Sequence, residues 1–173
     1  MNILDKYNNT LEKPPTLQQA NVIHSLLGAM RNFCVAVKTR DELLKHDILR
    51  IVSTYLKSDT LDIKWKALSI LRLIIKSSTE KNGLDILFED KTLGILEALV
   101  ENPSDHMGIM GETSRLICYM PIAAKNEARI KSFCRFKLIK MISLQLKSEH
   151  LIMLNEALLA LNVLVAIDYC MFL

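Results

Sequence analysis

The sequence predicts an all-α protein in which similar groups of helices stack as a solenoid. Two observations predict this fold: a composition that suits helices, and a residue pattern that recurs along the chain. Half of the 173 residues are hydrophobic, yet there are only 5 Gly and 4 Pro, and aromatic residues make up 6%. So few turn-forming residues argue against a β-sandwich or barrel, which needs a turn about every 8–12 residues. The apolar residues are mainly Leu, Ile, Met and Ala, most of which favour helices.

Apolar residues at helical spacing predict a series of helices after a polar lead-in. Thr39 and Glu42 have the spacing of a capping box before an apolar run, and Pro103 and Pro121 are expected at helix boundaries. The expected helices span residues 17–37, 40–57, 61–77, 82–88, 91–101, 105–119, 125–133, 135–146 and 149–167.

Internal repeats decide between the helical folds. LKSDTLDIKWKALSIL (56–71) aligns without a gap with LKSEHLIMLNEALLAL (146–161), and SDHMGIMGET (104–113) aligns with SEHLIMLNEA (148–157). Each copy, including a weaker one in SLLGAMRNF (25–33), carries a small anchor residue: Ala29, Ala67, Thr113 and Ala157. A helical period of about 42 residues is typical of armadillo or HEAT repeats.

We therefore expect an armadillo-type, right-handed superhelical solenoid of about four repeats. The repeats span 17–57, 58–101, 102–147 and an incomplete 148–167, between a polar lead-in (1–16) and a tail (168–173). Phe33, Leu71, Ile117 and Leu161 follow the anchors by one helical turn and are expected to be buried. The last helix is apolar on nearly every side, which predicts a fragment of a longer solenoid that self-associates when isolated.

Several function classes find no support in the sequence. The net charge is +3 with both signs mixed along the chain, so we expect no nucleic-acid partner. No apolar segment is long enough to predict membrane insertion, and no phosphate-cradling or nucleophile motif predicts an enzyme. His106 and His150 fall at equivalent repeat positions about 10 Å apart, which is too far to share a metal ion. We expect no metal and no cofactor.

The cysteines are expected to be structural. Cys34, Cys118 and Cys134 lie within apolar helical patterns, and no C-x-x-C pair is present. Buried, reduced thiols are therefore the simplest interpretation.

A helical solenoid binds its partners on a concave surface lined by the last helix of each repeat. Polar residues predicted on these helices could hydrogen-bond a partner chain; the alternative is that they are solvated only. We expect a partner-binding groove that includes Arg31, Asn32, Glu112, Arg115, Asn155 and Glu156, with Lys66, Arg72 and Asn162 also facing outward. Trp65 is expected to be half-buried core.

Four strings on these helices resemble consecutive armadillo repeats of the small-GTPase GDP dissociation stimulators. They are GAMRNF (28–33), KWKALSILRLII (64–75), DHMGIMGETSRLI (105–117) and SEHLIMLNEALLAL (148–161), and the resemblance covers residues 18–167. The family's M-G-E string matches at Glu112, its N-E-A-L string at Asn155 and Glu156, and its R-N-F string at Asn32.

The resemblance implies a cytoplasmic binding protein with guanine nucleotide exchange factor activity and no chemical catalysis. Its partners would be Ras- and Rho-type GTPases, gripped by their basic C-terminal tails before or after prenylation. The chain would form a carboxy-proximal part of a longer protein, monomeric in its full-length context. Two alternatives stay open: a generic armadillo adaptor that binds extended peptides, which a single tryptophan (Trp65) makes less favoured, and a truncated product without exchange activity.

Overall fold

The computed structural model describes residues 16–77, 83–124 and 126–166. These residues form α-helices and two short 3-10 helices, η1 and η2, joined by short connections, with no strand among them, as the sequence predicts. In chain order the elements are α2 (Leu17–Phe33), α3 (Val37–Leu44), α4 (Ile48–Thr54), η1 (Tyr55–Lys57), α5 (Leu61–Ser77), η2 (Leu84–Phe88), α6 (Asp90–Glu101), α7 (Met107–Ala124), α8 (Glu127–Cys134), α9 (Ile139–Gln145) and α10 (Leu151–Ala166).

The chain divides into two compact units, residues 1–83 (unit 1) and 84–173 (unit 2). The expected tail and all of the expected lead-in except Thr16 lie outside the described residues. The division into four repeats therefore stays a prediction, and the two units are described one at a time.

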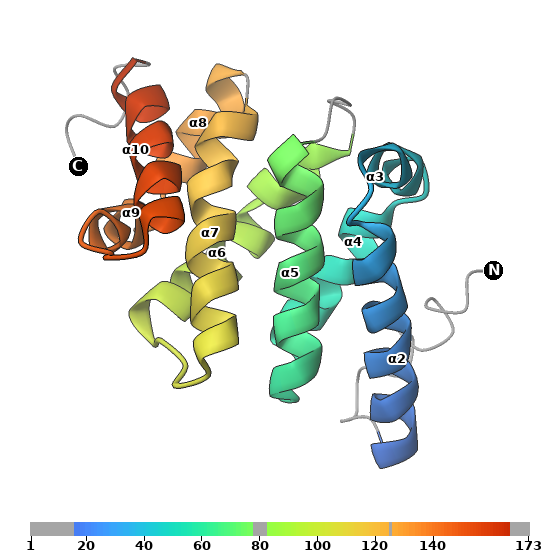
Figure 1. Ribbon diagram of the computed structural model, residues 1–173. Coiled ribbons are helices and arrows are strands. Elements are labelled where there is room, and N and C mark those ends of the chain that lie inside the picture. Colours follow the sequence, from blue (N-terminus) through green and yellow to red (C-terminus); the bar gives the residue numbers. More distant parts are fainter. Residues whose placement is uncertain (1–15, 78–82, 125, 167–173) are drawn as a thin grey trace. The chain divides into compact units, whose positions relative to one another are not determined.

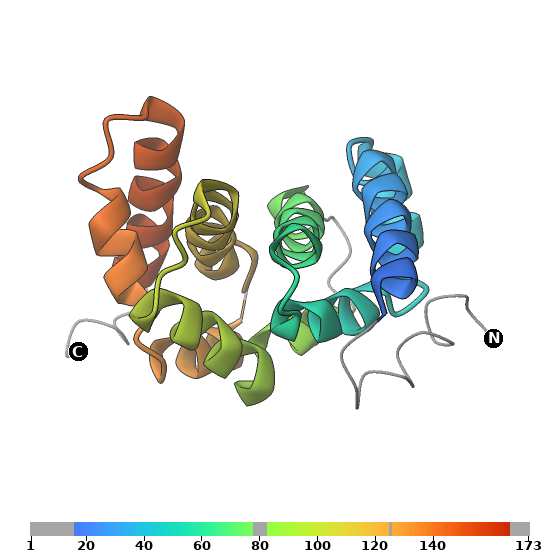
Figure 2. The same ribbon diagram turned by 90° about the horizontal axis from the view of Figure 1, so that it is seen from below.

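In unit 1 the long helices α2 and α5 lie side by side, and α3 and α4 pack against α5 (Figures 1 and 2). A capping box begins α2: the Thr16 amide donates to the Gln19 side chain at 2.8 Å, and the Gln19 amide donates to Oγ1 of Thr16 at 3.3 Å. The core includes Ile23 and Leu27 of α2 and Leu68 of α5, which are almost completely buried. Burying each such side chain contributes about 1.5–3 kcal/mol.

The helix expected over residues 40–57 is interrupted. Asp47 adopts a left-handed backbone with φ 53° between α3 and α4, a conformation that aspartate tolerates better than most residues. The expected capping box is also wrong, because Thr39 lies inside α3 and the helix begins after Ala36 without a side-chain cap. Arg40 instead turns inward and donates to the carbonyls of Cys34 and Val35, just after α2 ends.

In unit 2 the long helices α7 and α10 pack side by side, with α8 and α9 against α7. The two long helices begin alike, as the 44-residue offset predicts. The His106 amide donates to Oγ of Ser104 at 3.2 Å, and the His150 amide donates to Oγ of Ser148 at 3.1 Å. The His106 imidazole also caps α7, because its Nδ1 accepts from the Ile109 amide at 3.2 Å.

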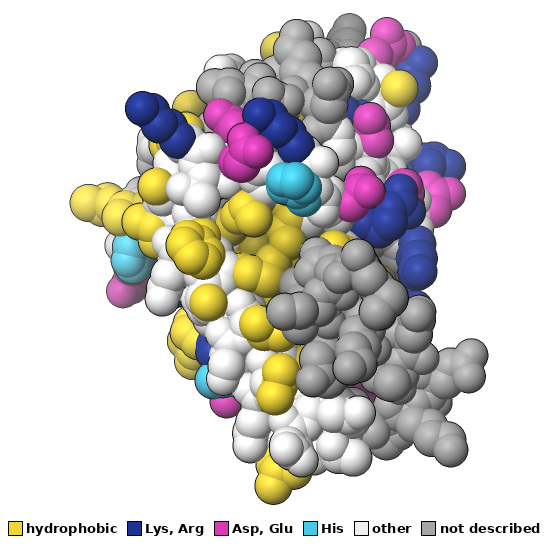
Figure 3. All heavy atoms as spheres, turned by 90° about the vertical axis from the view of Figure 1, so that its right-hand side faces the viewer, with side chains coloured by type: hydrophobic (Ala, Val, Ile, Leu, Met, Phe, Trp, Pro, Cys, Tyr) yellow, Lys and Arg dark blue, Asp and Glu magenta, His cyan; other side chains and the backbone are white. Residues whose placement is uncertain are grey.

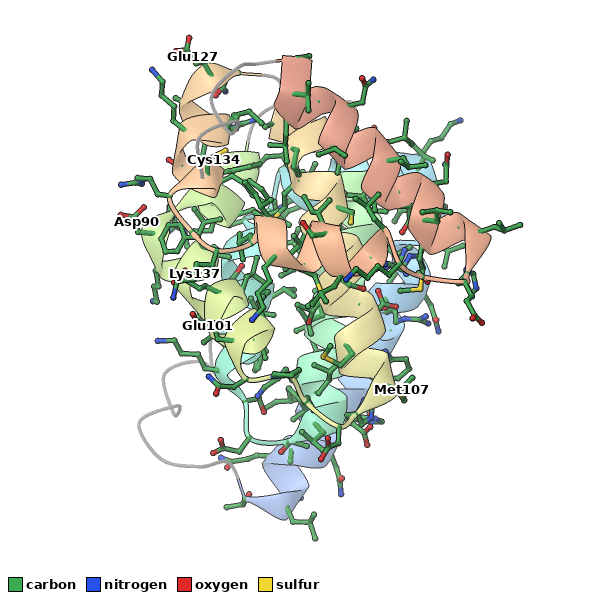
Figure 4. The ribbon with its side chains drawn as sticks, turned by 90° about the vertical axis from the view of Figure 1, so that its left-hand side faces the viewer. Asp90, Glu101, Met107, Glu127, Cys134 and Lys137 are labelled. Atoms are coloured by element: carbon green, nitrogen blue, oxygen red, sulfur yellow. The ribbon has the colours of Figure 1, made fainter. Side chains whose placement is uncertain are left out.

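A row of ion pairs joins η2 and α6 to α8 and the segment before α9. Asp85 accepts from Arg129 at 2.7 Å, Asp90 pairs with Arg135, and Glu101 pairs with Lys137. Figure 4 shows Asp90, Lys137 and Glu101 following one another along this side of unit 2. Most of these carboxylates and bases are exposed, so each pair contributes little by itself, and together they fix which surfaces meet.

Three local expectations are wrong. Pro121 does not end a helix, because α7 continues to Ala124 with the proline buried inside it; the helix continues although proline cannot donate a backbone hydrogen bond there. Phe33 is 60% exposed and Leu161 is half-buried, although Leu71 and Ile117 are buried as expected. Cys34 and Cys118 are free and buried, whereas Cys134 is disulfide-bonded, which depends on distances that sequence spacing does not reveal.

Exposed apolar side chains occur in both units. On α2 and the segment that follows, Leu17, Phe33 and Val35 are exposed, and hydrophobic side chains gather on this side of unit 1 (Figure 3). On α10, Leu151, Ile152, Leu158, Leu159 and Val165 are exposed. Within the described residues no helix is both long and apolar enough to span a bilayer.

Candidate partner-binding seams

The four helices expected to line a groove are the four long helices of the structure. They meet in pairs within each unit, and the line of side chains between the two members is here called a seam: the α2–α5 seam in unit 1 and the α7–α10 seam in unit 2. Three of the polar residues predicted from the repeats, Arg31, Arg115 and Glu156, make contacts across these seams.

The α7–α10 seam is built around a buried carboxylate. Arg115 donates to Glu156 from Nε at 2.8 Å and from Nη2 at 2.7 Å, and the Tyr119 hydroxyl donates to the same carboxylate at 2.6 Å. Such bidentate arginine–carboxylate pairs are among the strongest hydrogen-bonded contacts. Glu156 is only 3% exposed, so the expectation that it faces outward is wrong.

The protonation states around this carboxylate are fixed by burial and by the ion pair. Desolvation and the hydrogen bond to Glu156 raise the pKa of Tyr119 to about 12. The hydrogen bond to Glu156 raises the pKa of Arg115. Behind them, Cys118 donates to Oε1 of Gln145 at 3.4 Å, and burial raises the pKa of the Cys118 thiol to about 12. This thiol is therefore protonated and unreactive at neutral pH.

The α2–α5 seam contains two basic side chains and one aromatic ring. The guanidinium of Arg31 lies 5.5 Å from the centroid of the Trp65 ring, and its Nε donates to Oγ of Ser69 at 2.8 Å. Lys66 crosses the seam and donates from Nζ to the His24 carbonyl at 3.1 Å. Residue 28 is glycine, and a Cβ there would lie 3.2 Å from Nζ of Lys66, so the end of the lysine would have to shift slightly.

The structure brings some of the predicted residues together and leaves others apart. Arg115 and Glu156 are bonded to each other, and Arg31 contacts Trp65 and Ser69. Asn32 and Asn155 are exposed, Glu112 is half-buried, and Asn162 is exposed as expected. Arg72, like Glu156, is buried rather than outward-facing.

Two seam residues escaped the sequence-based selection of binding residues. Tyr119 follows Arg115 by one helical turn, and this spacing was the available signal that both reach one carboxylate. Lys66 was expected to face outward, but its alignment with Glu112 and Glu156 at the position before the anchor also marks it as a seam residue.

These features define the class of protein. Paired long helices, shorter helices packed beside them and a start motif repeated 44 residues apart make the chain an armadillo-type α-solenoid protein.

No protein-family model matches the chain. It is 29% identical over 168 residues to the Rap1 GTPase-GDP dissociation stimulator 1-A of Xenopus laevis, and 30% identical over the same length to the 1-B form from that organism.

The matched segment is 96% of this chain and 27% of each relative. The chain is therefore related to the small-GTPase GDP dissociation stimulators, as the four repeat strings indicated, and it spans about a quarter of the length of these relatives.

Proposed function

We propose that the chain binds a small GTPase of the Rap1 type and promotes release of its GDP, as part of an armadillo scaffold. One observation carries this proposal: the match to two relatives named as Rap1 GTPase-GDP dissociation stimulators extends over 96% of the chain. It therefore includes both seams and the exposed residues beside them.

The activity proposed needs no bond-breaking chemistry. A scaffold that binds the nucleotide-free GTPase more tightly than the GDP-bound form lowers the affinity for GDP by the same factor. Paired helices suit this role, because side chains held by packing lose less conformational freedom when a partner binds. In this proposal the exposed amides of Asn32 and Asn155 and the half-buried carboxylate of Glu112 contact the GTPase directly.

Glu156 and Arg115 act differently in the proposal. Their side chains bond each other across α7 and α10, so they set the spacing of the two helices that carry Glu112 and Asn155. The finer expectations belong to the same proposal: a client with a basic C-terminal tail, before or after prenylation, met in the cytoplasm.

Release of a fluorescent GDP analogue from a Rap1-type GTPase tests the proposal. The chain is added in excess over the loaded GTPase, with unlabelled GDP present and a full-length relative as positive control. We expect complex formation and faster release than the intrinsic rate. Absence of both, with the full-length relative active, would overturn the proposal.

An exposed asparagine on a seam helix provides a matched variant. Asn155→Ala removes an exposed amide that forms no hydrogen bond within the described residues, so we expect weaker GTPase binding at unchanged stability. Asn102→Ala removes another exposed amide, at the C-terminal end of α6, whose Nδ2 donates only a 3.5 Å hydrogen bond to the Ala98 carbonyl; this variant is expected to bind like the unsubstituted chain. Equal effects of the two substitutions would remove Asn155 from the proposed surface.

A further inference from the structure

The repeat register places equivalent residues at the two seams. In unit 2, the arginine two residues after the anchor Thr113 binds the glutamate one residue before the anchor Ala157; these are Arg115 and Glu156. In unit 1, the residue two after the anchor Ala29 is Arg31, and the residue one before the anchor Ala67 is Lys66. The α2–α5 seam thus keeps the arginine and replaces the carboxylate with a second cation.

In the part of the chain that the structure describes, the contacts of the two cations leave their charges without a counterion across the seam. Nε of Arg31 donates to a neutral hydroxyl on Ser69, and Lys66 donates to a backbone carbonyl. Within the described residues neither side chain forms an ion pair. Asp62 is the acid that acts on Lys66, and it lies one turn earlier on the same helix.

The electrostatics of the seam agree with this picture. Desolvation lowers the pKa of Lys66; the charge of Asp62 opposes this, and the charge of Arg31 adds to the lowering. Two half-buried cations on helices that pack together repel each other, and an anion placed between them would gain attraction from both.

The geometry of Arg31 suits a planar, bidentate anion. Its guanidinium is held by the Trp65 ring and by one hydrogen bond from Nε, and no hydrogen bond from its Nη groups occurs within the described residues. Planar Nη donors match a carboxylate. The chain itself uses this recognition in unit 2, where Arg115 holds a carboxylate with Nε and Nη2.

We propose that the α2–α5 seam binds a carboxylate of the GTPase partner, an Asp or Glu side chain in an acidic segment, in the place that Glu156 takes in the α7–α10 seam. The inference rests on the proposed function for the identity of the partner and on the register of the two seams for the chemistry. In this inference Arg31 and Lys66 contact an acidic segment of the GTPase, so the basic tail of the GTPase must bind another part of the scaffold.

The single tryptophan makes the seam directly observable. Trp65 is the only tryptophan of the chain and lies under Arg31, so its fluorescence reports on an anion bound there. We expect a hexaglutamate peptide to change this fluorescence saturably, with weaker binding as salt increases. A hexalysine peptide should have no effect. Inorganic phosphate shows whether any anion suffices; a response to phosphate as strong as that to hexaglutamate would overturn the assignment to a carboxylate.

Lys66→Glu supplies the missing carboxylate from within the chain. The new glutamate would pair with Arg31 as Glu156 pairs with Arg115. We therefore expect this variant to bind hexaglutamate at least about tenfold more weakly than the unsubstituted chain does. Lys57→Glu makes the same charge change at an exposed site on η1 and should leave the fluorescence response intact. Lys66→Gln, which removes only one charge, should fall between the two. Equal responses in the Lys66→Glu and Lys57→Glu variants would overturn the inference.

The same variants separate this inference from the proposed function. If the GTPase binds the unsubstituted chain and the Lys57→Glu variant but loses at least about tenfold in affinity for the Lys66→Glu variant, the inference holds. If it binds all three equally, the seam assignment fails and the proposed function stands. If the GTPase binds none of them, the proposed function fails, and the inference fails with it because its partner is then wrong.

Discussion

Arg115 of α7 and Glu156 of α10 are joined by two hydrogen bonds of 2.8 and 2.7 Å, which tie together two helices whose sequences repeat each other. The glutamate is nearly inaccessible to solvent, and Tyr119 contributes a third hydrogen bond. Such partners compensate the charge of a buried carboxylate, but the buried charge destabilises the fold when one partner is removed.

Arg115→Met should therefore destabilise the chain strongly. The substitution keeps most of the side-chain volume and leaves Glu156 with the tyrosine alone, which should cost about 3 kcal/mol of the free energy of unfolding. Urea unfolding measures the loss. A second substitution, Glu156→Leu, should recover much of it, since the uncompensated charge is then gone.

A surface arginine serves as the control for this prediction. Arg135→Met breaks the exposed pair with Asp90 and should cost less than about 1 kcal/mol. If Arg115→Met were no more costly than Arg135→Met, the buried pair would not hold the two helices together.

Tyr119 should resist ionisation. Its pKa is raised to about 12, first by desolvation and then by its bond to Glu156. Because the folded pKa lies above the unfolded value of about 10, the stabilisation is complete below pH 10 and is lost as the pH rises through 12. Phenolate absorbance should show that Tyr119→Phe removes a step near pH 12. Loss of a step near pH 10 would contradict the buried hydrogen bond.

Asp85 should contribute stability only above acidic pH. The hydrogen bond from Arg129 lowers the pKa of Asp85 below 3.8, so its contribution is present above that pH and is lost as the pH falls through the folded pKa. The carboxylate is largely exposed, so Asp85→Asn should cost less than about 1 kcal/mol at neutral pH. Urea unfolding well below pH 3.8 should show no difference from the unsubstituted chain.

The matched control for Asp85 is another exposed aspartate. Asp105→Asn removes a carboxylate that forms no ion pair within the described residues, and we expect little change at either pH. An effect of Asp105→Asn equal to that of Asp85→Asn would point to net charge rather than to the Arg129 pair.

The apolar face of α10 should drive association of the isolated chain. Leu158 and Leu159 are 51% and 48% exposed, and contiguous apolar surface of this kind favours self-association. Replacing both by glutamate should raise the monomer fraction seen in analytical ultracentrifugation. Ser143→Glu, which adds charge at an exposed site on α9, should not. A chain that is monomeric without substitutions would contradict the prediction.

The repeat pattern predicted the long helices better than it predicted their surroundings. The offset between Ser104 and Ser148 reappears as the same hydrogen-bonded turn before α7 and α10, because short-range hydrogen bonding depends on neighbouring residues. The break at Asp47 was not predicted, because a single left-handed residue leaves the apolar periodicity almost unchanged. Phe33 was expected to be buried by analogy with Leu71, but equivalent positions are buried only where a neighbouring helix covers them.

The sequence predicted which residues belong to the candidate site better than it predicted which of them contact each other. Arg115 and Glu156 were both selected, yet their pairing was not predicted, since they are 41 positions apart in the chain. Asn32 and Asn155 are exposed and remain available to a partner. The charge reversal at Lys66 became meaningful only when the structure showed which repeat positions face each other.

The affinity of the chain for a Rap1-type GTPase, measured by calorimetry with the GTPase GDP-bound and nucleotide-free, tests the central claim most directly. If the chain promotes GDP release, it must bind the nucleotide-free form more tightly, and GDP must weaken the complex by the same factor. Equal affinities for the two forms, or no binding to either, would contradict the account.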